Sequence, residues 1–105
     1  MSEWVRICSE KELPAVNRAR EFEAANRTIC VANVDGVVCA VDNVCPHHGG
    51  PLADGIVEDG KIVCPWHGWN FNSVTGKATH LPHAKVEVFR LSRRDGDVFV
   101  EVQSD

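Results

Sequence analysis

The sequence predicts an all-β protein that forms one domain over residues 1–105. β-branched residues recur along the chain, and Asp-Gly pairs at Asp35, Asp54, Asp59 and Asp95 mark tight turns between them. No repeat, linker or low-complexity segment interrupts this pattern. A chain of this length can bury a core, yet it is small enough for a bound metal to add useful stability.

Strands are expected where short apolar or alternating runs lie between turn signals. They are Val5–Cys8, Arg20–Ala24, Thr28–Val34, Val37–Val41, Ile56–Glu58, Lys61–Val63, Asn70–Asn72, Lys85–Leu91 and Val98–Val102. Within Lys85–Leu91 the apolar positions change phase between Val88 and Phe89. A bulge would explain that change, and so would a strand covered on both sides.

Two Asp-Gly pairs predict strand register as well as turns. A two-residue turn at Asp35-Gly36 pairs Cys30 with Val41 and Ala32 with Cys39. The two cysteines then lie diagonally, so we expect no disulfide between them. A turn at Asp59-Gly60 pairs Glu58 with Lys61 and, counting outward, Gly55 with Cys64. The short hairpin would therefore bring Cys64 back beside the segment that precedes it.

One segment resembles a helix start. Ser9 and Glu12 have the spacing of a capping box, but Pro14 follows so closely that at most one turn could form, and we expect a loop.

Cys8, Cys30 and Cys39 lie in apolar stretches, which favours small, buried and inert thiols.

The composition excludes several classes of protein. With 15 acidic and 11 basic residues, the net charge of −4 offers no basic face for nucleic acid. No apolar run approaches the ~20 residues of a membrane helix. Residues 1–4 lack the pattern of a signal peptide, so a cytoplasmic protein is expected. The chain also has no room for a second, catalytic domain.

Two short segments each set a cysteine and a histidine almost side by side. They are Cys45-Pro46-His47 and Cys64-Pro65-Trp66-His67, and both continue into glycine-containing turns. Thiolate and imidazole are ligands for soft and borderline metals. The repeated pairing predicts one metal centre held by two loops.

The spacing Cys-x-His, roughly sixteen residues, then Cys-x-x-His resembles the Rieske [2Fe-2S] family. The resemblance implies a Rieske fold of stacked antiparallel sheets with two cluster-binding loops at one end. It also implies one [2Fe-2S] cluster, with Cys45 and Cys64 binding one iron and His47 and His67 binding the other. Two neutral imidazoles in place of two thiolates make the site less negative and raise its reduction potential, from about −400 mV toward roughly −150 to +300 mV.

The chain departs from the high-potential members of that family. Gly50 and Trp66 occupy the positions of their disulfide cysteines, and Trp69 and Phe71 occupy the positions of their serine and tyrosine hydroxyl donors. Fewer donors to the cluster sulfurs leave the reduced state less stabilised. We therefore expect a potential near the low end of the range.

The pattern is closer to the small Rieske-type ferredoxins that serve ring-hydroxylating oxygenases. This resemblance implies a one-electron carrier, with no catalytic residue of its own, that accepts from a flavin-dependent reductase and delivers to a terminal oxygenase. Transient docking is expected near His47 and His67, with apolar neighbours such as Leu52 and Leu81-Pro82.

The remaining histidines are interpreted as loop residues rather than ligands: His48, His80 and His83. Trp66 and Trp69 are interpreted as loop supports.

Two alternatives stay open. The same cluster would suit a Rieske-like small subunit of a nitrite reductase or of another multicomponent oxidoreductase. Two cysteines and two histidines would also suit a zinc-stabilised interaction module, although zinc sites usually pair like with like at each spacing.

Overall fold

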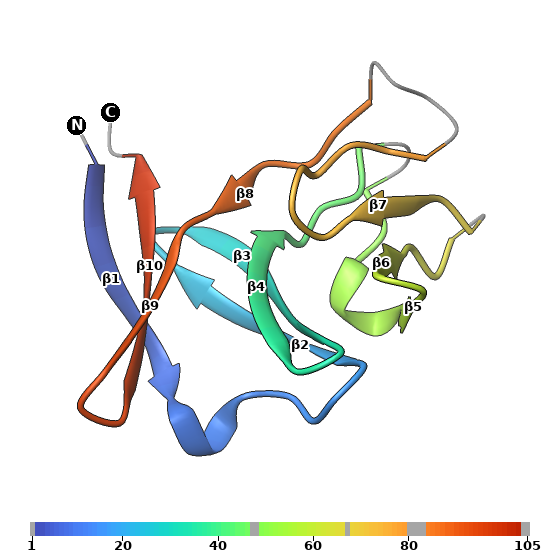
Figure 1. The fold of residues 1–105 in the computed structure, drawn as a ribbon. Helices are drawn as coiled ribbons and strands as arrows, with labels where there is room; N and C mark the ends of the chain where they lie inside the picture. Colours follow the sequence, from blue (N-terminus) through green and yellow to red (C-terminus); the bar gives the residue numbers. More distant parts are fainter. Residues whose placement is uncertain (1, 47–48, 67, 80–83, 104–105) are drawn as a thin grey trace.

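A computed structural model describes residues 2–46, 49–66, 68–79 and 84–103 of the chain, and it confirms the all-β prediction. Three antiparallel sheets follow one another across the molecule (Figure 1). The first contains β1 (Ser2–Ser9), β10 (Asp97–Gln103) and β9 (Leu91–Arg94), in that order. The second contains β2 (Arg18–Ala24), β3 (Arg27–Val34), β4 (Val37–Asp42) and β8 (Val88–Phe89). The third contains β5 (Ile56–Glu58), β6 (Lys61–Val63) and β7 (Asn70–Asn72).

The Asp-Gly turns set the hairpin registers as predicted. Asp35 and Gly36 have φ of 52° and 96°, and Asp59 and Gly60 have φ of 52° and 75°, the left-handed values of a two-residue hairpin turn. Val34 therefore pairs with Val37, and Glu58 with Lys61. The predicted pairs of the first hairpin, Cys30 with Val41 and Ala32 with Cys39, are confirmed. All five cysteines are free of disulfides.

The central strand β3 is buried on both faces because its successive residues point to different cores. Ile29 and Val31 pack toward the first sheet, in a cluster that includes Phe89 and Val100. Cys30, Ala32 and Val34 pack toward the third sheet. This second cluster also contains Cys45, Leu52, Val57, Ile62, Cys64, Phe71, Ala78 and Val86. The two predicted cysteine ligands thus belong to the core that joins the second and third sheets.

The expected strand over Lys85–Leu91 is corrected. The chain pairs with β4 through Val88 and Phe89, leaves that sheet at Arg90, and pairs with β10 from Leu91 onward. The phase change in the sequence therefore marks a strand that passes from one sheet to the next, which neither of the two sequence-based explanations included. Phe89 stays 4% exposed because it faces the core between those sheets.

Two single turns of 3-10 helix complete the described part. η1 (Glu10–Glu12) lies where a loop was expected, and it has the capping box: the Ser9 backbone N–H donates to Glu12 Oε1 at 2.9 Å. η2 (Leu52–Asp54) was not predicted. Neither helical turn in the described residues has the length that a membrane crossing requires. Figure 1 shows β5–β7 on the far side of the second sheet from the two termini.

Candidate metal centre

The first ligand loop leaves β4 and returns at η2 through a narrow turn. The backbone N–H of Cys45 donates to the Gly50 carbonyl at 2.9 Å, and the Gly49 N–H donates to the Cys45 carbonyl at 2.8 Å. One step further out, Val44 and Pro51 form an antiparallel bridge. This ladder holds the Cys45 backbone inside the turn, and the residue is 1% exposed.

The second ligand loop joins β6 to β7. The Cys64 N–H donates to the Trp69 carbonyl at 2.7 Å and closes the loop immediately beyond the last strand pair, Val63 with Asn70. Gly68 has φ of 70°, a left-handed conformation that glycine adopts without the steric cost of a Cβ. Cys64 is 2% exposed, so both loops direct their cysteine into the interior.

The two cysteine side chains meet. Cys45 lies close enough to Cys64 to raise the pKa of the Cys64 thiol, although the two residues are nineteen positions apart in the sequence. The backbone of the first loop closely approaches the second cysteine: a Cβ added at Gly50 would lie 2.9 Å from Cys64 Sγ and 3.0 Å from Trp66 Cδ2. Two converging soft ligands beside a glycine of this kind fit a metal cluster that needs thiolates from two loops.

Burial is the largest influence on the Cys64 thiol. It raises the pKa of this group, the backbone N–H of Trp66 acts in the opposite direction, and the adjacent Cys45 raises the pKa further. Two neighbouring thiolates in a buried position are therefore unfavourable on their own. A cationic group bound between them removes that penalty, since a coordinating thiol is deprotonated by its metal.

The predicted histidine ligands, His47 and His67, lie outside the described residues, and their ligation stays a prediction. The same holds for His48, His80, Leu81-Pro82 and His83. The described neighbours show the direction of the loops: Val44 is 51% exposed and Trp66 is 48% exposed, whereas the cysteines are buried. Each loop therefore has a buried cysteine side and a side that reaches the surface.

Trp66 of the second loop packs its ring against the backbone of Gly50 in the first. The sequence placed these two residues at the positions of the disulfide cysteines of high-potential Rieske proteins, and the structure brings the two positions together. Here an aromatic ring on a glycine connects the loops instead of a covalent bond. Trp69 packs against the core cluster that contains both cysteines, in agreement with its expected supporting role.

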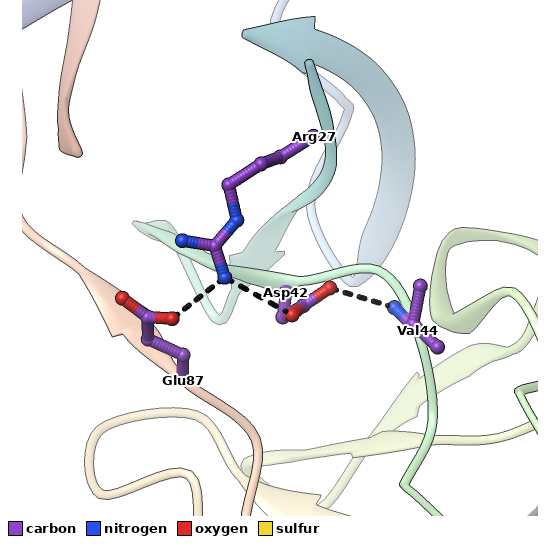
Figure 2. Close-up of polar contacts among 4 residues, drawn as sticks. All are labelled: Arg27, Asp42, Val44 and Glu87. Atoms are coloured by element: carbon purple, nitrogen blue, oxygen red, sulfur yellow. Dashed lines mark hydrogen bonds and ion pairs between the residues drawn. The ribbon is translucent and has the colours of Figure 1, made fainter. Parts of the chain in front are cut away.

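An ion-pair network holds the base of the first loop (Figure 2). Arg27 Nη2 donates to Asp42 Oδ2 at 3.4 Å and to Glu87 Oε1 at 2.6 Å. The other oxygen of Asp42 accepts the Val44 N–H at 3.0 Å. The guanidinium thereby connects the start of β3, the end of β4 and the segment before β8. Sequence reasoning missed this network because its members are far apart in the chain.

A residue next to that network was also missed. Asn43, two positions before Cys45, is 3% exposed, and both its side-chain nitrogen and its side-chain oxygen form hydrogen bonds. The only available signal was an amide side chain between a strand and a predicted ligand, which is too common to single it out.

The comparison with protein families decides how this site is classified. The model described as "Rieske [2Fe-2S] domain" matches residues 3–91. The chain belongs to the Rieske family. Membership implies one Rieske-type [2Fe-2S] cluster, which agrees with the cofactor inferred from the sequence.

Relatives of this Rieske protein include a ferredoxin component of similar length and a much longer oxygenase component. It is 35% identical over 83 residues to the ferredoxin component of the 2,4-dinitrotoluene dioxygenase system of Burkholderia sp. (strain RASC), which covers 78% of this chain and 79% of the relative. It is 47% identical over 74 residues to the oxygenase component of dicamba O-demethylase from Stenotrophomonas maltophilia, which covers 63% of this chain and 22% of the relative.

The solved structures agree with the fold. The Sphingomonas yanoikuyae B1 ferredoxin superposes with a TM-score of 0.84 at 27% identity, covering 96% of this chain and 100% of that one. The chain spans between 12% and 26% of the length of the first five curated relatives that it matches.

Proposed function

We propose that this protein, as a single Rieske domain over residues 1–105, is a one-electron carrier that accepts from a flavin-dependent reductase and delivers to a terminal oxygenase of the ring-hydroxylating type. The observation that carries the proposal is the match to a dioxygenase ferredoxin component over 79% of that protein's length. A carrier of this kind needs one cluster, a compact scaffold and a docking surface, and it needs no substrate cavity.

The proposed ligands are Cys45 and Cys64 for one iron and His47 and His67 for the other. The meeting of the two buried thiols supports the cysteine half of this set. When bound, the cluster supplies reversible one-electron chemistry at a potential above that of all-cysteine clusters. Leu52, which was expected beside the docking surface, instead lies with the thiols in the core. It shares that core with Ile62 and Phe71, each of the three 0% exposed, and the core keeps water from the sulfur side.

Docking is proposed at the loop tips near His47 and His67. The exposed Trp66 and Val44 beside them support this assignment, because transient partners need accessible apolar contacts close to the electron donor. Interfaces of transient redox complexes are small, below about 1,200 Å². The net charge of −4 favours a partner with a basic docking face, and we expect association to weaken with salt.

The proposal includes the absence of catalysis by this chain alone and a location in the cytoplasm. Cys8 and Cys30 support that location, since buried free thiols that are not ligands suit a reducing compartment.

A second candidate is the Rieske domain of a larger oxidoreductase. The higher identity to the dicamba O-demethylase oxygenase component, 47% over 74 residues, favours it. In that case the electron would pass to a partner site within one assembly rather than to a separate protein.

Complementation tests the proposal. The purified reductase and oxygenase of the 2,4-dinitrotoluene dioxygenase system, without their own ferredoxin, would be incubated with this protein, NADH and substrate. Product formation that depends on this protein supports the carrier. Reversible reduction by dithionite with no product in any such mixture would contradict the proposed partners, and product from this protein without the oxygenase would contradict the absence of catalysis.

A further inference from the structure

Asn43 is one of two buried polar residues in the described part of the chain, the other being Ser73. It follows the last residue of β4 and precedes Cys45 by two positions. A buried amide costs free energy unless its donors and acceptors are satisfied. Its partners therefore indicate what the residue does.

Four hydrogen bonds surround Asn43, and two of them close the first ligand loop. The Asn43 carbonyl accepts the Leu52 N–H at 2.8 Å, and the side-chain Oδ1 accepts the Ala53 N–H at 2.8 Å. The other two anchor the closed loop to the second sheet: the Asn43 backbone N–H donates to the Thr28 carbonyl at 3.1 Å, and Nδ2 donates to Glu21 Oε1 at 2.8 Å.

These bonds lie where the loop that contains Cys45 leaves β4 and returns at η2. We call this part the neck of the loop. From the neck toward the tip of the loop, the next connections are the Val44–Pro51 bridge and then the hydrogen bond from the Cys45 N–H to the Gly50 carbonyl. Leu52, on the returning side, is 0% exposed in the core cluster shared by Cys45 and Cys64. The neck therefore fixes the distance of Cys45 from the second sheet and, through that sheet, from Cys64.

We propose that Asn43 is a positioning residue for the cluster: its amide clamps the neck of the first ligand loop and holds Cys45 in place against Cys64. The inference rests on the proposed ligation by Cys45. The loss of such an outer-shell contact typically lowers metal affinity by about 10- to 100-fold.

Glu21 sets the orientation of the clamp. A carboxylate only accepts hydrogen bonds, so it selects the NH2 side of the amide and directs Oδ1 toward Ala53. In Asn43→Asp, an oxygen would face the Glu21 carboxylate and repel it. Combined with Glu21→Gln, the polarity is reversed: an aspartate at position 43 can accept from both the Gln amide and the Ala53 N–H.

The test is the rate of iron release to a chelator under anaerobic conditions, together with the EPR spectrum of the dithionite-reduced holo-protein. Asn43→Ala and Asn43→Asp should release iron about 10- to 100-fold faster and should broaden the EPR lines. The double variant Asn43→Asp/Glu21→Gln should return toward the wild-type rate and spectrum.

Asn33→Ala is the matched control. Asn33 also makes two side-chain hydrogen bonds, from Nδ2 to the Pro14 carbonyl at 3.1 Å and from the Gly36 N–H to Oδ1 at 2.9 Å, but at the opposite end of the β3–β4 hairpin. Its loss should lower thermal stability without changing iron release or the EPR spectrum. Equal iron release from Asn33→Ala and Asn43→Ala would overturn the proposal, because the effect would then be one of general stability.

Glu21→Ala keeps the test decisive if the Asn43 variants fold poorly, since Glu21 is an exposed residue of β2. Iron release faster than in the wild type supports the clamp, and an unchanged rate overturns it. Failure of the clamp is distinct from failure of the ligand assignment. A Cys45→Ser protein that keeps the wild-type spectrum would remove the assignment on which the inference rests, whereas an unaffected Asn43→Ala would remove only the clamp.

Discussion

At the scale of single residues, Gly50 shows how closely the two ligand loops approach. A side chain there has no free volume, because its Cβ would lie 2.9 Å from Cys64 Sγ and 3.0 Å from the Trp66 ring. The φ of Gly50 is not in the left-handed region, so its role is one of space rather than of backbone conformation.

The variant Gly50→Ala should therefore lose the cluster. The added methyl group displaces Cys64 or Trp66. Because metal sites are sensitive to changes in their surroundings, iron per chain and visible absorbance should both fall below about half of the wild-type value. The matched control is Gly60→Ala, where φ of 75° imposes strain but no atom lies within 4 Å of the new Cβ. Loss of stability with full iron content is expected for the control. Full iron content in Gly50→Ala would show that the loops can separate at no cost.

Cys30 gives a prediction of pH dependence. Burial raises the pKa of its thiol from 9.0 to about 12, with smaller contributions from Cys39 and Glu21. The native protein should therefore resist alkylation of Cys30 by iodoacetamide at pH 8, as measured by mass spectrometry, whereas the unfolded chain should react. Because the folded pKa is the higher one, the unfolded state loses its proton first, and the contribution of this group to stability falls as the pH rises from 9 to 12. Rapid alkylation of Cys30 in the native state would contradict its burial.

At the scale of elements, the Arg27 network joins three segments around the base of the first loop (Figure 2). The side chains are between 27% and 43% exposed, so solvent screens the ion pairs and their contribution is modest. Arg27 also stacks over Phe89, with 4.9 Å between Cζ and the ring centroid. This cation–π contact adds to the same connection between β3 and β8.

Replacing Arg27 by methionine keeps an apolar side chain and removes the charge. The free energy of unfolding should fall by about 1 kcal/mol in chemical denaturation, and the difference should shrink at high salt. Arg6→Met is a suitable comparison, because its ion pair with Asp97 at 2.9 Å is more exposed, at 52% and 40%. A smaller effect is expected there. Equal effects of the two variants, or a difference that does not depend on salt, would argue against the network.

How much of the fold the sequence predicts depends on how local the determining contacts are. The hairpins at 35–36 and 59–60 are predicted in register, since a two-residue turn alone fixes the pairing. The passage of the chain between sheets at Arg90 is not predictable in this way. β9 pairs with β10 across the turn at Asp95-Gly96, but β8 pairs with β4, which is distant in sequence. In the same way, Cys45 and Cys64 are found from their spacing, whereas Asn43 and Arg27 act through contacts with Glu21 and Glu87 that the tertiary structure alone creates.

At the scale of the whole molecule, the structure divides the work between two cores. The cluster between the first and second sheets stabilises the scaffold, and the cluster between the second and third sheets contains both cysteines. The first ligand loop follows β4 of the second sheet and the second joins β6 to β7 of the third, so the core between these two sheets connects both loops. A rigid connection of this kind would limit structural change on electron transfer, as the proposed carrier role requires.

The same arrangement bears on the reduction potential. Phe71 is 0% exposed in the core next to the second loop, at a position where high-potential members of the family have a tyrosine hydroxyl. Protein-film voltammetry should give a midpoint near the low end of the Rieske range, about −150 mV, and Phe71→Tyr should shift it upward. A wild-type midpoint well above zero would show that backbone donors replace the missing hydroxyl groups.

The proposed cluster is bound by two cysteines and two histidines from two loops. Pulsed EPR of the dithionite-reduced protein, prepared with ¹⁵N-labelled histidine, tests it most directly, because only nitrogen ligands of the iron give strong hyperfine coupling. We predict coupling from two histidine nitrogens, lost stepwise in His47 and His67 variants. A reduced protein without histidine coupling, or one that contains zinc and gives no paramagnetic signal, would contradict the account.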